Sequence, residues 1–233
     1  MCKTRPSAVA DGHYTRAVPQ VISLFLYILP SRTNFAPPRI NILQQPVHYS
    51  NRGDSQMISM TPEQAAFLLQ YNLPSVKNEY RTTSALIAAI PSSNADYRPD
   101  PQARSAAEIA WHIAATEHRF YNGVLSGAFD FNAIPRPEGG ITRENILKWY
   151  ADSFAKNFES LTRLTPQQAA KIMDFRGMFQ LPAVTYLDFC IRHTVHHRGQ
   201  LSTYLRAMGG KVPAIYGESY DSAEAKKASA QAN

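Results

Sequence analysis

The chain has 233 residues, of which 44% are hydrophobic and 18% are charged, as is usual for a globular protein and unlike a disordered or fibrous one. This length fits one globular domain with additional sequence better than two full domains. The two cysteines, Cys2 and Cys190, are too far apart in the sequence for a disulfide framework or a paired-cysteine zinc site, so we expect a reducing cytoplasmic setting. The longest strongly apolar run, residues 21–29, is too short to span a bilayer as a helix, so no membrane partner is expected.

The net charge of +6 is concentrated near the start of the chain. Residues 1–57 carry six basic and two acidic side chains, a net charge of +4, which leaves +2 for residues 58–233. The nearly neutral remainder offers no basic face of the kind that neutralises phosphates. We therefore expect no nucleic-acid partner.

Residues 1–57 also contain six prolines and show no sustained helical period, so they are not expected to build a core. We expect a leader that is disordered or is not part of the fold. A secretory signal is one alternative, because Arg16 precedes the apolar stretch, although no small-residue cleavage pattern follows Leu29. A second alternative is that translation begins later than assigned and this segment is upstream sequence, since Met57 or Met60 would be a natural first residue.

From Thr61 onward, caps, prolines and apolar spacing predict four long helices and almost no strand. Thr61 with Gln64 and Ser105 with Glu108 form capping boxes, and Thr142 is a third N-cap. Prolines and glycines mark the helix ends. The expected helices cover residues 62–90, 106–127, 142–165 and 183–209.

Four amphipathic helices within residues 58–220 predict an all-α four-helix bundle. Connections of about ten to twenty residues leave its topology open at this point. The segment 221–233 is rich in Ala, Ser and Lys, and we expect it to be disordered.

The last helix carries a cluster of histidines in the sequence "HTVHHRGQ" from His193 to Gln200. His193 and His197 are one helical turn apart, a spacing that lets two imidazoles reach one metal ion. On a helical wheel they lie about 80° and about 40° from the centre of the apolar side, so both border the core. His196 lies about 60° from His193 in the direction away from the apolar side, so it is expected to face solvent or a partner.

The second helix offers His112 and His118 as a third ligand. His112 borders the buried face, about 90° from its centre, whereas His118 lies about 120° from His112 in the direction away from that face. His112 is therefore the better choice, and a hydrogen-bonded histidine at the edge of the core is the alternative. Glu117 is either an acceptor for a ligand N–H or, by default, an exposed carboxylate.

Three other residues near the histidines each have two possible roles. Cys190 is an extra soft ligand or, more simply, a buried inert thiol. Arg198 and Gln200 orient the helix or bind a substrate carboxylate, and structural hydrogen bonding is the simpler role for both.

Two segments, "AEIAWHIAATEHRFY" at 107–121 and "HTVHHRGQLSTYLRAMGGKVPAIYG" at 193–217, resemble the DinB superfamily of four-helix-bundle proteins. The likeness covers roughly residues 58–220, and the second segment is the more specific. It implies a divalent metal, zinc, nickel or iron, held by His112, His193 and His197. It also implies an up-down-down-up bundle, a homodimer and a cytoplasmic bacterial setting, and it does not imply DNA binding.

A three-histidine site leaves coordination positions for water or substrate, as catalytic zinc sites do. Some relatives in this family are thiol-dependent S-transferases, so the resemblance favours a metal-dependent transferase acting on a small-molecule thiol and its substrate. A metal-dependent hydrolase and a non-catalytic metal-binding stress protein are the alternatives. A di-iron carboxylate bundle would need Glu-x-x-His repeats, which the sequence lacks. An interaction module would need an exposed aromatic face, for which Trp111 with Tyr121 is a weak candidate.

Overall fold

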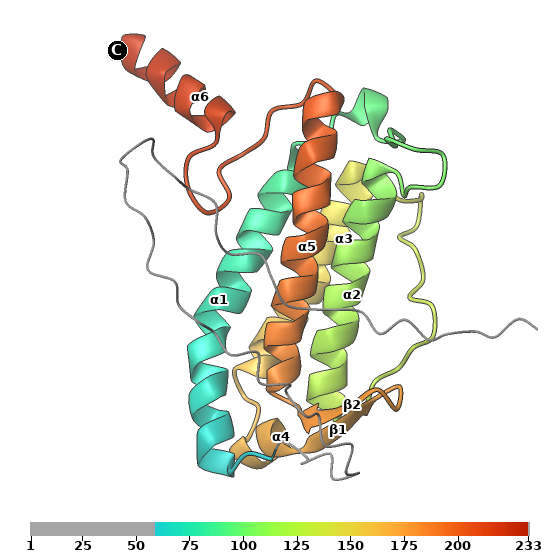
Figure 1. The fold of residues 1–233 in the computed structure, drawn as a ribbon, viewed down its shortest axis with the longest axis vertical. Helices are drawn as coiled ribbons and strands as arrows, with labels where there is room; N and C mark the ends of the chain where they lie inside the picture. The colour runs from blue at the N-terminus through green and yellow to red at the C-terminus, as the bar shows by residue number, and fades with distance from the viewer. Residues whose placement is uncertain (1–58, 233) are drawn as a thin grey trace, which may run out of the picture. The chain divides into compact units, whose positions relative to one another are not determined.

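The computed structural model describes residues 59–232, so the expected leader at 1–57 lies outside the described residues. Four long helices form a bundle: α1 (Pro62–Ala88), α2 (Ala106–Ser126), α3 (Arg143–Leu161) and α5 (Thr185–Ala207). In Figure 1, α1 and α5 run upward and α2 and α3 run downward. The expected all-α, up-down-down-up bundle is confirmed.

The helix starts follow from local capping. The side chains of Thr61 and Ser105 each accept a hydrogen bond from the backbone N–H three residues later. In turn, the side chains of Gln64 and Glu108 accept from the backbone N–H of Thr61 and Ser105. The side chain of Thr142 caps α3 in the same way, accepting from the N–H of Asn145 at 3.2 Å. These bonds satisfy N–H groups that have no partner within the helix, which is why the sequence alone locates these starts.

The helix α2 ends at a glycine because its last turn closes in a left-handed conformation. Gly127 has φ +75°, and its N–H donates to the carbonyl of Gly123 at 2.8 Å. Any other residue type would be strained at this dihedral angle.

Three small elements were not expected from the sequence. They are the short helix α4 (Pro166–Ala170) and an antiparallel pair, β1 (Ile172–Phe175) and β2 (Phe179–Pro182), in which Phe175 faces Phe179 and Ile172 faces Pro182. The turn between the strands places Arg176 and Gly177 at φ +57° and +68°. Asn-Gly or Asp-Gly is the usual sequence of such a turn, so Arg-Gly gave no hairpin signal. A 3₁₀ turn, η1 (Ser92–Asn94), lies between α1 and α2.

A further helix, α6 (Tyr220–Gln231), covers most of the segment that the sequence predicted to be disordered. Ser219 caps it, and none of its residues is buried. Its first turn is held by Asp221, which accepts from the N–H of Val212 at 2.8 Å and pairs with Arg206 at 2.7 Å. The composition of the segment did not reveal these two contacts, because both partners lie outside it.

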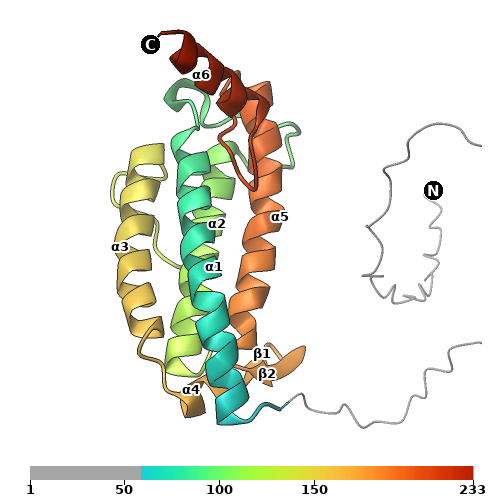
Figure 2. The same cartoon turned by 90° about the vertical axis from the view of Figure 1, so that its left-hand side faces the viewer.

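The helices α2 and α5 are neighbours in the bundle, and this arrangement positions the site. Figure 2 shows α1 in front and α2 behind, with α3 and α5 at the sides. Each side helix therefore contacts both α1 and α2. No helix within residues 59–232 has the length and apolarity needed to cross a membrane.

The interior contains two apolar clusters, and Tyr80 packs against both of them. Leu187 and Phe154 belong to the cluster near the hairpin, and Ile113 and Leu201 belong to the cluster near the other end. The buried polar residues include Glu117, Thr194 and Arg198. Buried groups of this kind are stable only when they are hydrogen-bonded, so their partners are described with the site.

Candidate metal centre

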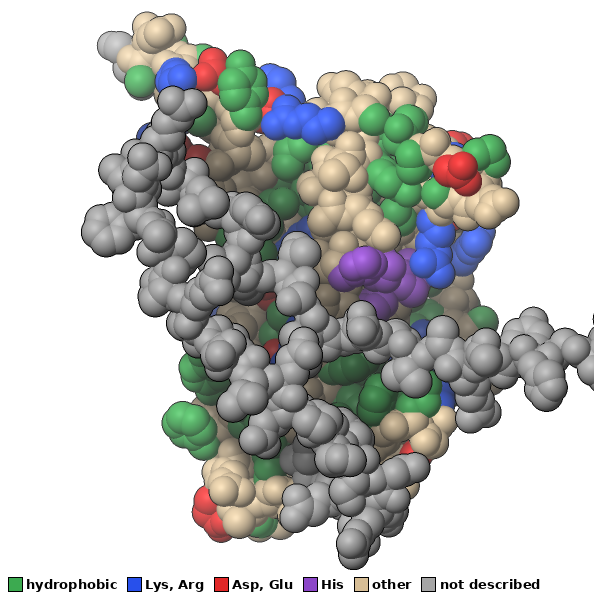
Figure 3. Space-filling model, viewed as in Figure 1, with side chains coloured by type: hydrophobic (Ala, Val, Ile, Leu, Met, Phe, Trp, Pro, Cys, Tyr) green, Lys and Arg blue, Asp and Glu red, His purple; other side chains and the backbone are tan. Residues whose placement is uncertain are grey.

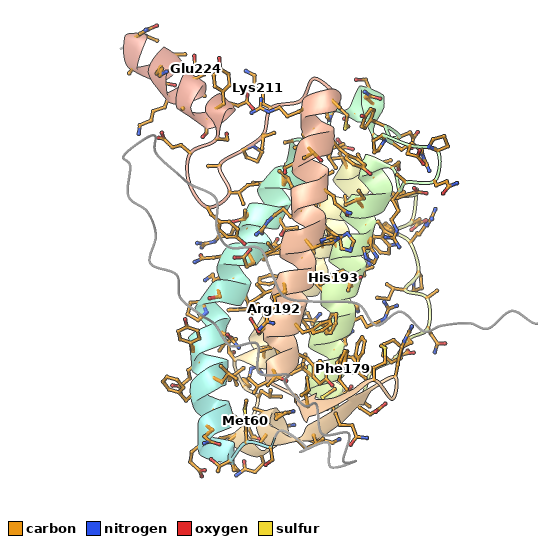
Figure 4. All side chains as sticks on the ribbon, viewed as in Figure 1. Met60, Phe179, Arg192, His193, Lys211 and Glu224 are labelled. Atoms are coloured by element: carbon orange, nitrogen blue, oxygen red, sulfur yellow. The ribbon has the colours of Figure 1, made fainter. Side chains whose placement is uncertain are left out.

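Three histidine side chains from two neighbouring helices meet between α2 and α5. His112 is on α2, and His193 and His197 are one turn apart on α5. The Nε2 atom of His112 lies 3.2 Å from Nε2 of His193 and 3.1 Å from Nε2 of His197. Figure 4 shows the labelled His193 on the side of α5 that faces α2. The structure thus brings together the three residues that the sequence singled out.

The donor set fits a divalent cation. Each histidine offers one ring nitrogen, and the three nitrogens lie within 4.8 Å of one another. With Zn–N bonds of about 2.0–2.1 Å and tetrahedral angles, two ligand nitrogens of one ion lie ~3.3 Å apart. Hydrogen bonding alone explains the contacts less well, because a single Nε2 carries either one proton or one lone pair and forms one good bond. His112 Nε2 has two such neighbours.

The outer ring nitrogens of the three histidines have different partners. His197 Nδ1 lies 2.7 Å from Oε1 of Gln200, which fixes a proton on Nδ1 and leaves the Nε2 lone pair free for a metal. His112 Nδ1 has the hydroxyl of Thr116 at 3.5 Å, a much weaker contact. His193 Nδ1 is buried and has no hydrogen-bond partner among the described residues.

The histidines are held neutral. Burial lowers the pKa of His112 to about 3 and the pKa of His193 to about 4, and it also lowers the pKa of His197. The positive charge of Arg104 contributes in the same direction for all three. A metal ion needs unprotonated imidazole, so the cluster is ready to bind one at neutral pH.

An open cavity of about 380 Å³ adjoins the cluster at His112. One wall is a stripe of α2 that includes Trp111, Ala115 and Thr116, and the opposite wall is the connection between α2 and α3, with Ile134. This volume is within the range of small-molecule sites. A ligand in the cavity would lie directly against His112.

Glu117 lies in the core beneath the histidines and is only 1% exposed, so the expectation of an exposed carboxylate was wrong. Three hydroxyl groups donate to it: Tyr150 at 2.6 Å, Thr194 at 2.8 Å and Tyr121 at 3.2 Å. Burial raises its pKa, and these hydrogen bonds oppose the rise. The helical wheel missed this position because the apolar residues of α2 occupy nearly its whole circumference, so the centre of the buried face was poorly defined. Glu117 bonds no ligand histidine; it ties α2 to α3 and α5.

Arg198 and Gln200 have the structural roles that the sequence favoured. The guanidinium of Arg198 is 1% exposed and pairs with Glu79, and it also bonds the hydroxyls of Thr83 and Tyr216. Gln200 is exposed and holds His197. Arg198 thus connects α5 to α1.

The other sequence candidates lie apart from the cluster. His196 is exposed, as expected. His118 bonds Asn122 at 2.7 Å and Asn157 at 3.1 Å. Cys190 is buried outside the three-histidine group, and burial raises the pKa of its thiol well above the usual value. The inert reading of Cys190 is therefore the one the structure favours.

The proposed aromatic face does not exist as a surface. Trp111 is 9% exposed and Tyr121 is 3% exposed, so both belong to the core. Trp111 packs edge to face on Trp149, with ring centroids 4.8 Å apart. The sequence placed these side chains on the surface because the neighbours that cover them come from another helix.

Two residues at the site were not anticipated from the sequence. Thr116 follows His112 by one helical turn, so its contact could have been inferred from spacing. Arg104 lies in the loop just before the Ser105 cap, where no periodic pattern indicates direction. Only the fold brings its charge near all three histidines.

Comparison with known proteins agrees with this fold. The family model described as the DinB family matches residues 63–229. The uncharacterised protein YjoA of Bacillus subtilis is 30% identical over 133 residues, covering 54% of this chain and 82% of YjoA. The uncharacterised protein YrdA of the same organism is 26% identical over 154 residues, covering 64% of this chain and 88% of YrdA.

Solved structures show the same fold. A DinB-like protein from Bacillus cereus superposes with a TM-score of 0.54 and 24% identity, covering 62% of this chain and 95% of that protein. The structure of B. subtilis YjoA gives a TM-score of 0.53 and 20% identity, covering 64% of this chain and 99% of YjoA. With the family model spanning most of the described bundle, this chain belongs to the DinB family.

Proposed function

We propose that this protein binds one divalent metal ion, zinc, nickel or iron, through His112, His193 and His197. With this ion it acts as a thiol-dependent S-transferase. The observation that carries the proposal is the convergence of three neutral imidazoles, one of which, His112, lines an open cavity. Three protein ligands leave coordination positions for a substrate, whereas structural zinc sites are closed by four.

A divalent cation at this site would favour the thiolate form of a coordinated thiol, which is the nucleophile in S-transfer. The chain itself would orient and shield this chemistry. Gln200 holds His197 with its Nε2 toward the site, and Thr116 lies near the outer nitrogen of His112. The cavity beside His112 would receive the thiol and the molecule that it attacks.

The nearby carboxylates favour thiol transfer over hydrolysis, the alternative use of such a site. Hydrolysis gains from a general base that removes a proton from water. Glu108 accepts from the N–H of Ser105 at 2.8 Å and pairs with Arg98 at 3.3 Å. Glu117 is buried and already accepts from three hydroxyls. Neither is available to remove a proton from water. A metal ion acidifies both ligands, but a thiol is already far more acidic than water and so depends less on a separate base.

A cobalt-substituted protein tests the proposal. Adding 2-mercaptoethanol should produce a sulfur-to-cobalt charge-transfer band, and the band should be absent in the metal-free protein. The titration is repeated in Cys190→Ala, so that any band from that thiol is recognised. An unchanged spectrum at saturating thiol, with cobalt still bound, would favour a hydrolase or a non-catalytic metal-binding protein instead.

A further inference from the structure

The cavity beside His112 is strongly positive. Its lining includes three arginines, Arg104, Arg119 and Arg136, against one acid, Glu108, a net charge of +2 before any metal is bound. In Figure 3 the histidine side chains lie next to a group of Lys and Arg side chains on the same face. A cavity that focuses one sign of charge attracts ligands of the other sign.

Two of these four charged side chains already have partners, and two, Arg104 and Arg136, do not. Arg119 donates to the backbone carbonyls of Asp130 at 3.0 Å and Asn132 at 2.8 Å, so it anchors the loop that forms the outer wall. Glu108 is occupied by Arg98 and by the N–H of Ser105. Arg104 and Arg136 are exposed on the cavity wall and have no ion pair or hydrogen bond with any described residue. We place the anion at Arg104 because it directly precedes α2 and its charge lowers the pKa of all three histidines, as expected of the arginine nearer to the cluster.

The rest of the lining indicates what the anion would be attached to. Trp111, Ala115 and Ile134 add apolar surface to the cavity that Arg104 and His112 also line. A planar guanidinium matches a carboxylate, with which it can form two parallel hydrogen bonds. An apolar body that carries a carboxylate therefore fits both surfaces.

We propose that this cavity binds a small-molecule carboxylate, with Arg104 pairing the carboxylate group while the rest of the ligand lies over Trp111 toward His112. This inference rests on the proposed function in that it names the substrate class of the same site. It also predicts that the carboxylate binds without the metal, so an experiment can test the carboxylate site separately from the S-transferase function.

The chain carries its own reporter, because its two tryptophans are Trp111 in the cavity wall and Trp149 packed against it. Metal-free full-length protein is titrated with 3-phenylpropionate and with its uncharged isostere 3-phenylpropionamide, and tryptophan fluorescence is followed. The acid should bind at least about fivefold more tightly than the amide, the factor expected for an exposed ion pair of good geometry.

Arg104→Gln should remove this preference, and Arg104→Lys should restore part of it, since lysine keeps the charge but lacks the planar fork. Arg163→Gln is the control, because it removes the same charge at an exposed position outside the cavity lining, where Arg163 pairs with Glu159. The control should keep the preference. Equal binding of acid and amide, absence of binding, or a preference that survives in Arg104→Gln would each overturn the proposal.

A second arm uses cobalt-loaded protein with 3-mercaptopropionate and 3-mercaptopropionamide. If both thiols give the charge-transfer band with equal affinity, thiol binding stands and the carboxylate site fails. If neither gives a band but the acid still binds the metal-free protein through Arg104, the carboxylate site stands and the S-transferase proposal fails. A band with tighter binding of the acid, lost in Arg104→Gln, supports both.

Discussion

At the level of single residues, the three histidines are equivalent as donors but are supported unequally. His197 is oriented by Gln200, His112 is only weakly contacted by Thr116, and His193 lacks a partner for its outer nitrogen among the described residues. A hydrogen bond to the outer nitrogen fixes both the tautomer and the direction of a ligand. The site is therefore most rigid at His197, and the direction of His193 depends on its burial.

Replacing His112, His193 or His197 by Ala should reduce bound metal from about one ion per chain to close to none, because two imidazoles hold a divalent ion far less tightly than three. Metal analysis of the purified variants measures this. His118→Ala and His196→Ala are matched controls, since both residues lie outside the cluster, and they should retain the metal. Loss of metal in a control with retention in His193→Ala would show that the ligands are assigned incorrectly.

At the level of secondary-structure elements, Glu117 is the point at which three helices meet. It accepts from Thr194 on α5, Tyr150 on α3 and Tyr121 on α2 itself. Thr194 immediately follows His193, so the bond from Thr194 to Glu117 fixes the rotation of α5 relative to α2. This rotation determines whether His193 and His197 point toward His112.

Thr194→Val should destabilise the protein by about 1–2 kcal/mol, because it keeps the shape of the side chain but leaves a buried carboxylate oxygen with one donor fewer. Urea unfolding of the metal-free protein measures the change in the free energy of unfolding. Thr203→Val is the control on the same helix: Thr203 is exposed and bonds only the carbonyl of Gln200. The control should change stability by less than about 0.5 kcal/mol. Equal effects of the two substitutions would mean that the Glu117 bonds do not stabilise the bundle.

At the level of the whole molecule, residues 59–232 contain the four bundle helices, both apolar clusters and the histidine cluster. Each of the two clusters draws on more than one helix, which gives this part of the chain a core of its own. It thus has the elements expected of an independently folding domain.

Deleting residues 1–57 should leave the helical circular dichroism signal and the melting temperature nearly unchanged, because a proline-rich segment without apolar periodicity has little buried area to lose. Thermal unfolding of the full and shortened chains, each with and without zinc, makes the comparison. A drop of more than about 5 °C, corresponding to one or two kcal/mol for a chain of this size, would place part of the leader in the folded domain.

The four bundle helices and the three clustered histidines could be predicted from the sequence, whereas α4 and α6 could not. Thr61, Ser105 and Thr142 act on N–H groups three residues away, so their effect does not depend on the rest of the fold. His193 and His197 share a face because the helical period fixes it.

What those helix faces contact depends on the folded bundle. Glu117 looked like a surface acid, and its burial depends on hydroxyls from α3 and α5 that are 33 and 77 residues away in sequence. The hairpin at 172–182 depends on a turn with positive φ. The first turn of α6 depends on contacts that Asp221 makes outside its own helix. Arg104 became part of the site only when the start of α2 was placed beside the histidines of α5. Local hydrogen bonds and helical period can be read along the chain, whereas burial and charge proximity depend on which segments the folded bundle brings together.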